Sequence, residues 1–181
     1  MRNVDDKRIC RLVTHFRMAV EKACKEGCFD KDFIFHSFPR ACCGDTCYLL
    51  AEYLHSKGID TIYVWGDCEG QSHAWLVAKD YRVKNPTKRF YIVPEEIRQV
   101  LNFYGSDIDD EPKDVTRYEE DDLIDGLIID ITADQFGEEP VYVNYMDDFH
   151  GKFEFEAAHD CEGVYNARLD NLYRIIAEFI S

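Results

Sequence analysis

The sequence predicts a single α+β domain, because helical and strand-like segments follow one another without a regular β-α-β alternation. Two observations carry this prediction. Apolar residues recur at spacings of three and four over residues 4–27, which indicates a helix. Two β-rich runs at 61–65 and 72–78 flank the turn-forming stretch GDCEGQ, which predicts an antiparallel hairpin. At 181 residues the chain fits one domain, residues 1–181, around a small antiparallel sheet.

The first half of the chain has clear helix boundaries. The N-terminal helix ends at Gly27, and Pro39 interrupts the connection that follows it. A second helix begins at Cys43 and is ended by Gly58. One face of this helix is an apolar stripe made of Cys47, Leu50, Ala51 and Leu54.

The second half is less regular. Residues 94–103 begin with proline and two glutamates, a typical helix start. The acidic run at 105–122 has few apolar residues and is predicted to be a mobile loop. The runs 127–131 and 140–145 are strand candidates, and 167–180 is predicted to be an amphipathic helix.

Composition restricts the possible partners and location. Hydrophobic residues make up 46% of the chain, enough for a buried core. The net charge of −15 argues against binding to nucleic acid or to an anionic membrane, whereas a basic protein partner would be electrostatically favoured. There is no stretch of membrane-spanning length and no apolar signal segment at the N-terminus, so we expect a cytoplasmic protein. Its eight cysteines are then expected to be reduced thiols.

Three short segments carry residue types that work together in acyl transfer. Cys43 opens a helix in FPRACCGDTC, His73 lies in the strand-like GQSHAWLV, and Asp130 ends a strand in LIIDITADQF. A thiolate nucleophile needs an imidazole to hold it as an ion pair and a carboxylate to orient that imidazole. A helix N-terminus favours the thiolate and offers N–H groups to an oxyanion. We therefore predict Cys43, His73 and Asp130 as catalytic residues.

Several neighbouring residues are alternatives or helpers. Cys42 is the rival nucleophile, although it is better explained as a packing residue, and Asp134 is the alternative orienting carboxylate. Asp45 is expected mainly to satisfy N–H groups at the helix start. With Gln71 and Trp75 it forms the predicted substrate-binding set. Cys47 reads as a core residue, and the remaining histidines read as surface or core residues: His15, His36, His55, His150 and His159.

A zinc site near the cysteine pair is disfavoured. His36, Cys42, Cys43 and Cys47 are close in sequence, but C-C-x-x-x-C is not a usual ligand spacing. The sequence contains no glycine-rich phosphate loop. We expect neither a metal nor another cofactor.

These segments resemble the transglutaminase-like branch of the papain-like fold. Members often carry a cysteine followed two residues later by an acidic residue, then an apolar helix ending in Gly-Ile, here Cys43, Asp45 and Gly58-Ile59. The family's histidine strand commonly reads His-Ala-Trp, matched by residues 73–75. Its aspartate strand commonly reads Asp-Pro-Thr, matched loosely by residues 130–132, in which isoleucine replaces proline.

The resemblance spans residues 38–136 and implies a catalytic Cys-His-Asp triad on a papain-like core. Residues 80–122 would then be an insertion between the histidine and aspartate strands, able to reshape the cleft. The implied activity is that of a thiol hydrolase or acyltransferase acting on a peptide, protein or small amide, with a peptidase or amidase preferred to a transglutaminase or deamidase. The alternative is an inactive module of the same fold that docks to a basic protein partner.

Overall fold

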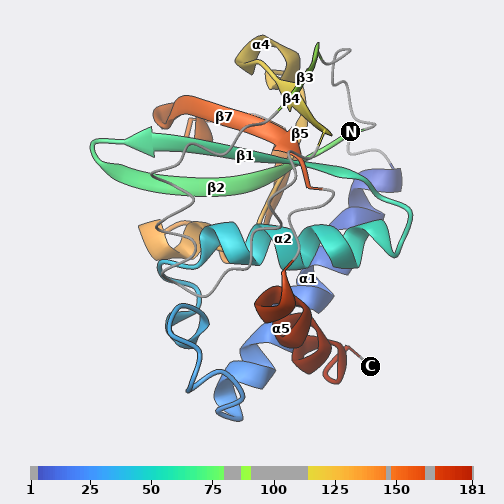
Figure 1. The fold of residues 1–181 in the computed structure, drawn as a ribbon, viewed down its shortest axis with the longest axis vertical. Coiled ribbons are helices and arrows are strands. Elements are labelled where there is room, and N and C mark those ends of the chain that lie inside the picture. The colour runs from blue at the N-terminus through green and yellow to red at the C-terminus, as the bar shows by residue number, and fades with distance from the viewer. Residues whose placement is uncertain (1–3, 80–86, 91–113, 146–147, 162–165, 181) are drawn as a thin grey trace.

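A computed structural model of the chain shows a mixed α+β architecture (Figure 1). The structure describes residues 4–79, 87–90, 114–145, 148–161 and 166–180. Within these ranges, seven strands form one antiparallel sheet in the order β3-β4-β7-β1-β2-β5-β6. Three of the described helices, α1, α2 and α5, lie together on one side of the sheet (Figure 1).

The central hairpin is the framework for the rest of the sheet. β1 pairs with β2 along its whole length, from Thr61 opposite Ala78 to Cys68 opposite Gln71. β7 pairs with the other edge of β1, and β5 with the other edge of β2. The strands are β1 Thr61–Cys68, β2 Gln71–Ala78, β3 Thr87–Phe90, β4 Asp114–Tyr118, β5 Leu127–Asp130, β6 Tyr142–Tyr145 and β7 Glu154–Asp160.

The helices comprise two long elements and several short ones. The α-helices are α1 Val4–Lys25, α2 Cys43–His55, α4 Glu120–Leu123 and α5 Ala167–Ala177. Single turns of 3-10 helix occur at η1 Phe35–Ser37, η2 Ala133–Phe136 and η3 His150–Lys152. No helix in the described ranges combines the length and apolar character needed to cross a bilayer.

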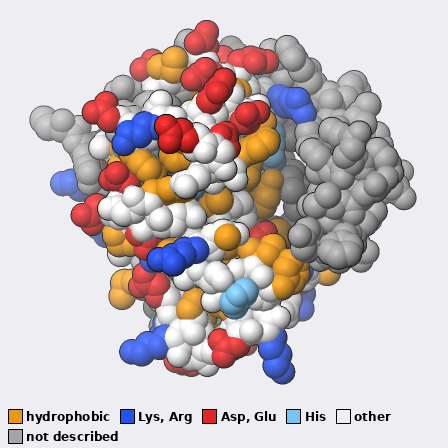
Figure 2. Space-filling model, turned by 90° about the vertical axis from the view of Figure 1, so that its left-hand side faces the viewer, with side chains coloured by type: hydrophobic (Ala, Val, Ile, Leu, Met, Phe, Trp, Pro, Cys, Tyr) orange, Lys and Arg blue, Asp and Glu red, His pale blue; other side chains and the backbone are white. Residues whose placement is uncertain are grey.

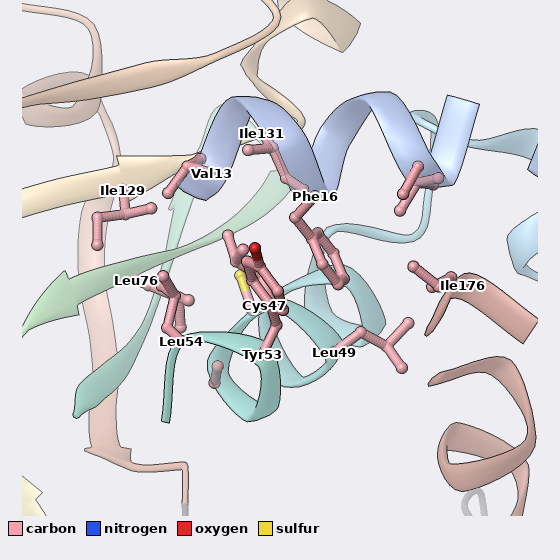
Figure 3. Packing of buried hydrophobic residues seen from close by; sticks show 14 of the residues in the cluster. Val13, Phe16, Cys47, Leu49, Tyr53, Leu54, Leu76, Ile129, Ile131 and Ile176 are labelled. Carbon is pink, nitrogen blue, oxygen red and sulfur yellow. The ribbon is translucent and has the colours of Figure 1, made fainter. Parts of the chain in front are cut away.

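The larger core lies between the helices and the sheet. Leu50 and Leu54 of α2 are almost completely buried, and they belong to the same cluster as Phe16 of α1 and Leu76 of β2. Figure 3 shows Phe16, Leu54 and Leu76 converging around Cys47. Because α2 contributes apolar residues at helical spacing, its axis is fixed against the sheet, and so is the position of its first residue, Cys43.

A second core covers the opposite face of the sheet. Alternation along β2 sends Ala74, Leu76 and Ala78 to the helical side, whereas Trp75 and Val77 belong to the second cluster. That cluster continues through the following residues of the neighbouring elements: Ile62, Val64, Tyr118, Leu123, Ile128, Phe153 and Ala158. β2 is therefore buried on both faces, which explains its continuous apolar sequence.

The structure confirms the α+β class, the first two helices, the hairpin and the C-terminal helix, but it corrects the size of the sheet. β7 was not expected, and the sheet is larger than the small one predicted. The acidic run 105–122 is not simply a loop, since residues 114–118 form β4 and residues 120–123 form α4. The helix predicted at 94–103, and much of the predicted insertion 80–122, lie outside the described residues.

Candidate active site

Cys43 is the first residue of α2, as its sequence context indicates. Cys42 precedes it as the N-cap and makes no side-chain hydrogen bond to the helix, so the first-turn N–H groups are not capped by that residue. Gly44 follows, where an added Cβ would lie 3.4 Å from the hydroxyl of Tyr63. A Cβ at this position would make only van der Waals contact with the end of the Tyr63 side chain, so the start of α2 lies against β1 without a clash.

His73 lies near the start of β2 and is completely buried. Its Nε2–H donates to Oδ2 of Asp130 across 2.7 Å. Opposite His73 on β1 is Gly66, where an added Cβ would lie 2.7 Å from the carbonyl oxygen of Glu154. Glycine at this position lets β7 approach the strand that backs His73.

Asp130 is the last residue of β5 and is 2% exposed. Its Oδ1 accepts two hydrogen bonds from Thr132, one from the backbone N–H at 2.7 Å and one from the hydroxyl at 3.1 Å. Its Oδ2 accepts from His73 and is also 3.3 Å from Nε2 of His150. The carboxylate therefore has two neighbours at each oxygen.

The charged forms of His73 and Asp130 stabilise each other. Burial alone lowers the pKa of His73, but hydrogen bonds to Asp130 and Cys43, together with their charges, outweigh it and raise the pKa to about 9. Burial alone would raise the pKa of Asp130, but hydrogen bonds from His150 and His73 and their charges bring it well below its ordinary value. An imidazolium paired with a carboxylate is thus the stable form near neutral pH.

The structure brings the three predicted catalytic residues together. Cys43 of α2 also lies close enough to His73 for its thiol to contribute to the raised pKa of the imidazole. Because Nε2 of His73 is hydrogen-bonded to Asp130, Nδ1 is the ring nitrogen that can exchange a proton with the thiol of Cys43. The amide nitrogen of Gln135 lies 3.4 Å from Nδ1, a contact that the neutral ring with its proton on Nε2 can accept and that the imidazolium gives up.

The rival residues occupy other positions. Asp134 forms a salt bridge with Arg17 of α1 at 2.7 Å, so Asp130 is the carboxylate on His73. Cys42 is 2% exposed, and burial raises the pKa of its thiol to about 12, which leaves it unreactive at neutral pH. Cys47 is buried in the larger core.

The predicted substrate-binding residues are spread over three environments. Asp45 accepts a hydrogen bond from Arg168 of α5 at 2.8 Å, and burial, partly offset by that arginine, raises its pKa. Gln71 is exposed at the first position of β2. Trp75 is 3% exposed, and its ring centroid lies 5.8 Å from that of His73. Trp75 therefore supports the histidine from within the core.

Both terminal helices, which the family resemblance leaves unexplained, reach the site. From α1, Arg17 donates to the carbonyl oxygen of Ile131, the residue after Asp130, and to both oxygens of Asp134. From α5, Arg168 bridges Asp45, two residues after Cys43, and Asp32. Each helix thereby fixes a segment next to a predicted catalytic residue.

His150 is the functional candidate that sequence reasoning missed. It is 1% exposed in η3, far along the chain from His73, and it reaches the same carboxylate oxygen. Its local sequence, DDFHGK, has no pattern that marks this role. Phe149 beside it and Phe136 and Phe153 nearby pack around His73, which closes off the second face of the sheet there.

His73, Asp130 and His150 are also the described residues that could hold a metal ion, since their ligand atoms lie within 4.8 Å of one another. The spacing fits hydrogen bonds better. The two histidine nitrogens are 2.7 and 3.3 Å from the same oxygen. Tetrahedral zinc with ligands at about 2.0–2.2 Å separates its ligand atoms by about 3.3–3.5 Å. An ion would therefore have to push His73 away from Asp130.

The side of the molecule that carries the β1–β2 turn and the start of α2 is shown in Figure 2. Hydrophobic side chains form a broken band across its middle, and acidic side chains gather above that band.

Comparisons with protein-family models, curated proteins and solved structures give no match to this chain.

Proposed function

We propose that the chain is a cysteine-dependent hydrolase or acyltransferase that cleaves amide bonds through a thioester on Cys43, on a papain-like, transglutaminase-like core. The observation that carries this proposal is the approach of the partly exposed Cys43 to His73, which is itself hydrogen-bonded to the buried Asp130. A nucleophile, a base and a group that orients the base are the parts that acyl transfer requires.

The proposed first step is acylation. The Cys43 thiolate attacks the carbonyl carbon of the substrate amide, and the carbonyl oxygen becomes an oxyanion. N–H groups of the first turn of α2 stabilise that charge. The C–N bond then breaks as the leaving nitrogen takes the proton from the His73 imidazolium, which releases the amine and leaves the acyl group on sulfur.

The second step removes the acyl group. Water attacks the thioester carbon while neutral His73 accepts its proton, the C–S bond breaks, and the carboxylic acid leaves with the Cys43 thiolate restored. If an amine replaces water, the same step is transamidation. Peptidase or amidase action is the preferred reading, with a peptide, protein or small amide as the substrate.

The arrangement of elements supports this reading of the fold. The proposed nucleophile begins a helix that packs on an antiparallel sheet, and the histidine and aspartate lie on β2 and β5, which pair directly. The order cysteine, histidine, aspartate along the chain is the order in the family that the sequence resembles. The competing reading, an inactive module that docks to a basic partner, rests on the net charge of −15.

Acylation by an activated ester tests the proposal without knowledge of the substrate. The protein is incubated with p-nitrophenyl acetate, acetylated peptides are mapped by mass spectrometry, and nitrophenol release is followed over many turnovers. We expect acetyl-Cys43 that forms and decays, and its loss in His73→Ala. The exposed thiol of Cys28 is the internal control. Acetylation of Cys43 no faster than that of Cys28, and unchanged in His73→Ala, would favour the binding module.

A further inference from the structure

A Cys-His-Asp triad does not require a second buried histidine, yet His150 contacts the carboxylate of Asp130. We propose that His150 is a positioning residue for this reaction, which donates a hydrogen bond from Nε2 to Oδ2 of Asp130 and holds that carboxylate ionised beside His73. The inference rests on the proposed function for its catalytic consequence, although the hydrogen bond itself can be tested separately.

The first argument is that His150 completes the coordination of the carboxylate. An ionised carboxylate has about four lone-pair positions, two at each oxygen. Thr132 fills both positions at Oδ1 with its N–H and its hydroxyl. His73 fills one position at Oδ2, at 2.7 Å, and His150 is the group placed at the other, at 3.3 Å. Without His150, one lone pair of a buried anion would lose its donor.

The second argument is that aromatic side chains surround His150, and in the described structure neither the Trp75 indole N–H nor the Tyr142 hydroxyl is hydrogen-bonded to Asp130. Three aromatic rings, those of Trp75, Tyr142 and Phe149, have centroids 5.2, 4.8 and 4.8 Å from the imidazole. Asp130 is 2% exposed, so solvent does not screen its charge. When a buried carboxylate loses one of its hydrogen-bond donors, its pKa rises, because the ionised form loses stabilisation that solvent does not replace.

The third argument concerns the charges around Asp130. The titratable groups that act on it from the described elements are His73 of β2, His150 of η3 and the buried thiol of Cys47 of α2. The two histidines favour the ionised carboxylate, whereas a charged thiolate at Cys47 would oppose it. His73 loses its positive charge when its Nδ1 gives up a proton during catalysis, whereas the hydrogen bond from His150 to Asp130 is not part of that proton transfer.

Loss of His150 should change how the reactivity of Cys43 depends on pH below neutrality. If Asp130 takes up a proton, His73 loses its anionic partner and no longer supports the thiolate. Removing His150 should therefore move the acid limit of Cys43 reactivity to higher pH while leaving reactivity near pH 8 largely intact. A purely structural role in packing would lower reactivity by the same factor at every pH.

The test compares two substitutions at one position. His150→Leu removes the donor and keeps an apolar side chain, whereas His150→Gln keeps an N–H that can reach the carboxylate. Tyr142→Leu is the packing control, because Tyr142 contacts the ring of His150 and makes no hydrogen bond to Asp130 in the described structure. The full chain is used throughout, and circular dichroism confirms that each variant is folded.

Two readouts are measured from pH 4 to pH 8. The first is the carbon-13 shift of the Asp130 carboxyl, which reports its ionisation whether or not the protein is an enzyme. We expect the midpoint to lie below pH 4 in the unmodified chain, His150→Gln and Tyr142→Leu, and to rise to about pH 6 in His150→Leu. The second is iodoacetamide labelling of Cys43, expected to fall about tenfold at pH 5 in His150→Leu alone.

The outcomes separate the two proposals. If Cys43 of the unmodified chain is no more reactive than Cys28, the proposed function fails, and the carboxyl titration still decides the role of His150. If Cys43 is activated but the Asp130 midpoint is equal in His150→Leu and the unmodified chain, the positioning role is wrong and the enzyme stands. Zinc binding that is lost in both His150 variants, and that displaces His73, would replace the positioning role with a metal site.

Discussion

Asp130→Asn should remove the pH dependence that the His73–Asp130 pair gives to folding stability. The substitution keeps the size of the side chain and deletes its charge. One oxygen can still accept from Thr132, as Oδ1 does now. The new NH2 group then faces Nε2 of His73 as a donor, so that nitrogen must become an acceptor. His73 loses both its anionic partner and its tautomer.

The magnitude follows from the pKa of His73, which is raised from 6.5 to about 9 in the folded protein. A group whose pKa is higher in the folded state contributes stability that is complete below its unfolded value and lost as the pH rises through its folded value. For His73 the loss runs from pH 6.5 to about 9. Between pH 6 and pH 8 it amounts to about 2 kcal/mol of unfolding free energy.

Urea unfolding at pH 6 and pH 8 measures this difference. We expect the unmodified protein to lose about 2 kcal/mol more than Asp130→Asn does over that interval, because contributions of titrating groups that do not contact Asp130 cancel in the comparison. Asp134→Asn is the matched control, since its partner Arg17 does not titrate in this range and its cost should be equal at both pH values. Parallel losses in the unmodified protein and Asp130→Asn would refute the reasoning.

Two further predictions concern the elements that hold the site. Arg17→Met should lower the unfolding free energy by about 3 kcal/mol, because it leaves Asp134 and a backbone carbonyl without their buried partner. Glu21→Gln, at the half-exposed end of the same network, should lower it by less than about 1 kcal/mol. Equal costs in a denaturant titration would argue against the anchor. Gly66→Ala should cost about 1–3 kcal/mol through the clash with β7, and Gly151→Ala, with open space around it, should be near neutral. Similar midpoints for the two glycine variants would contradict the close approach of β7.

The parts of the fold with strong local patterns could be predicted. The second helix has an apolar stripe and a glycine stop, and the hairpin has two β-rich runs around a turn, so both were located closely. The sheet was underestimated because β7 is amphipathic. The segment KFEFEAAHD, which is β7 and the two residues before it, begins with alternating apolar and acidic residues, a period-two pattern that is typical of a strand with one exposed face.

Only the site residues that stand in a recognisable local sequence context could be predicted. Cys43 sits at a helix start and His73 lies in an apolar strand, and each context can be read within a few residues. The choice between Asp130 and Asp134 could not be made that way, because it depends on Arg17 from a distant helix. His150 depends on η3 folding back over β2 and β5, a tertiary contact with no local signature.

The central claim is that His73 activates Cys43. The most direct test is the rate of iodoacetamide labelling at Cys43 from pH 5 to pH 9, read by peptide mass spectrometry in the Cys42→Ser background, with exposed Cys28 as the internal reference. We predict that labelling of Cys43 is already near its plateau at about pH 6 and collapses in His73→Ala. Labelling that rises only near pH 8.5, in parallel with Cys28 and indifferent to His73, would contradict it.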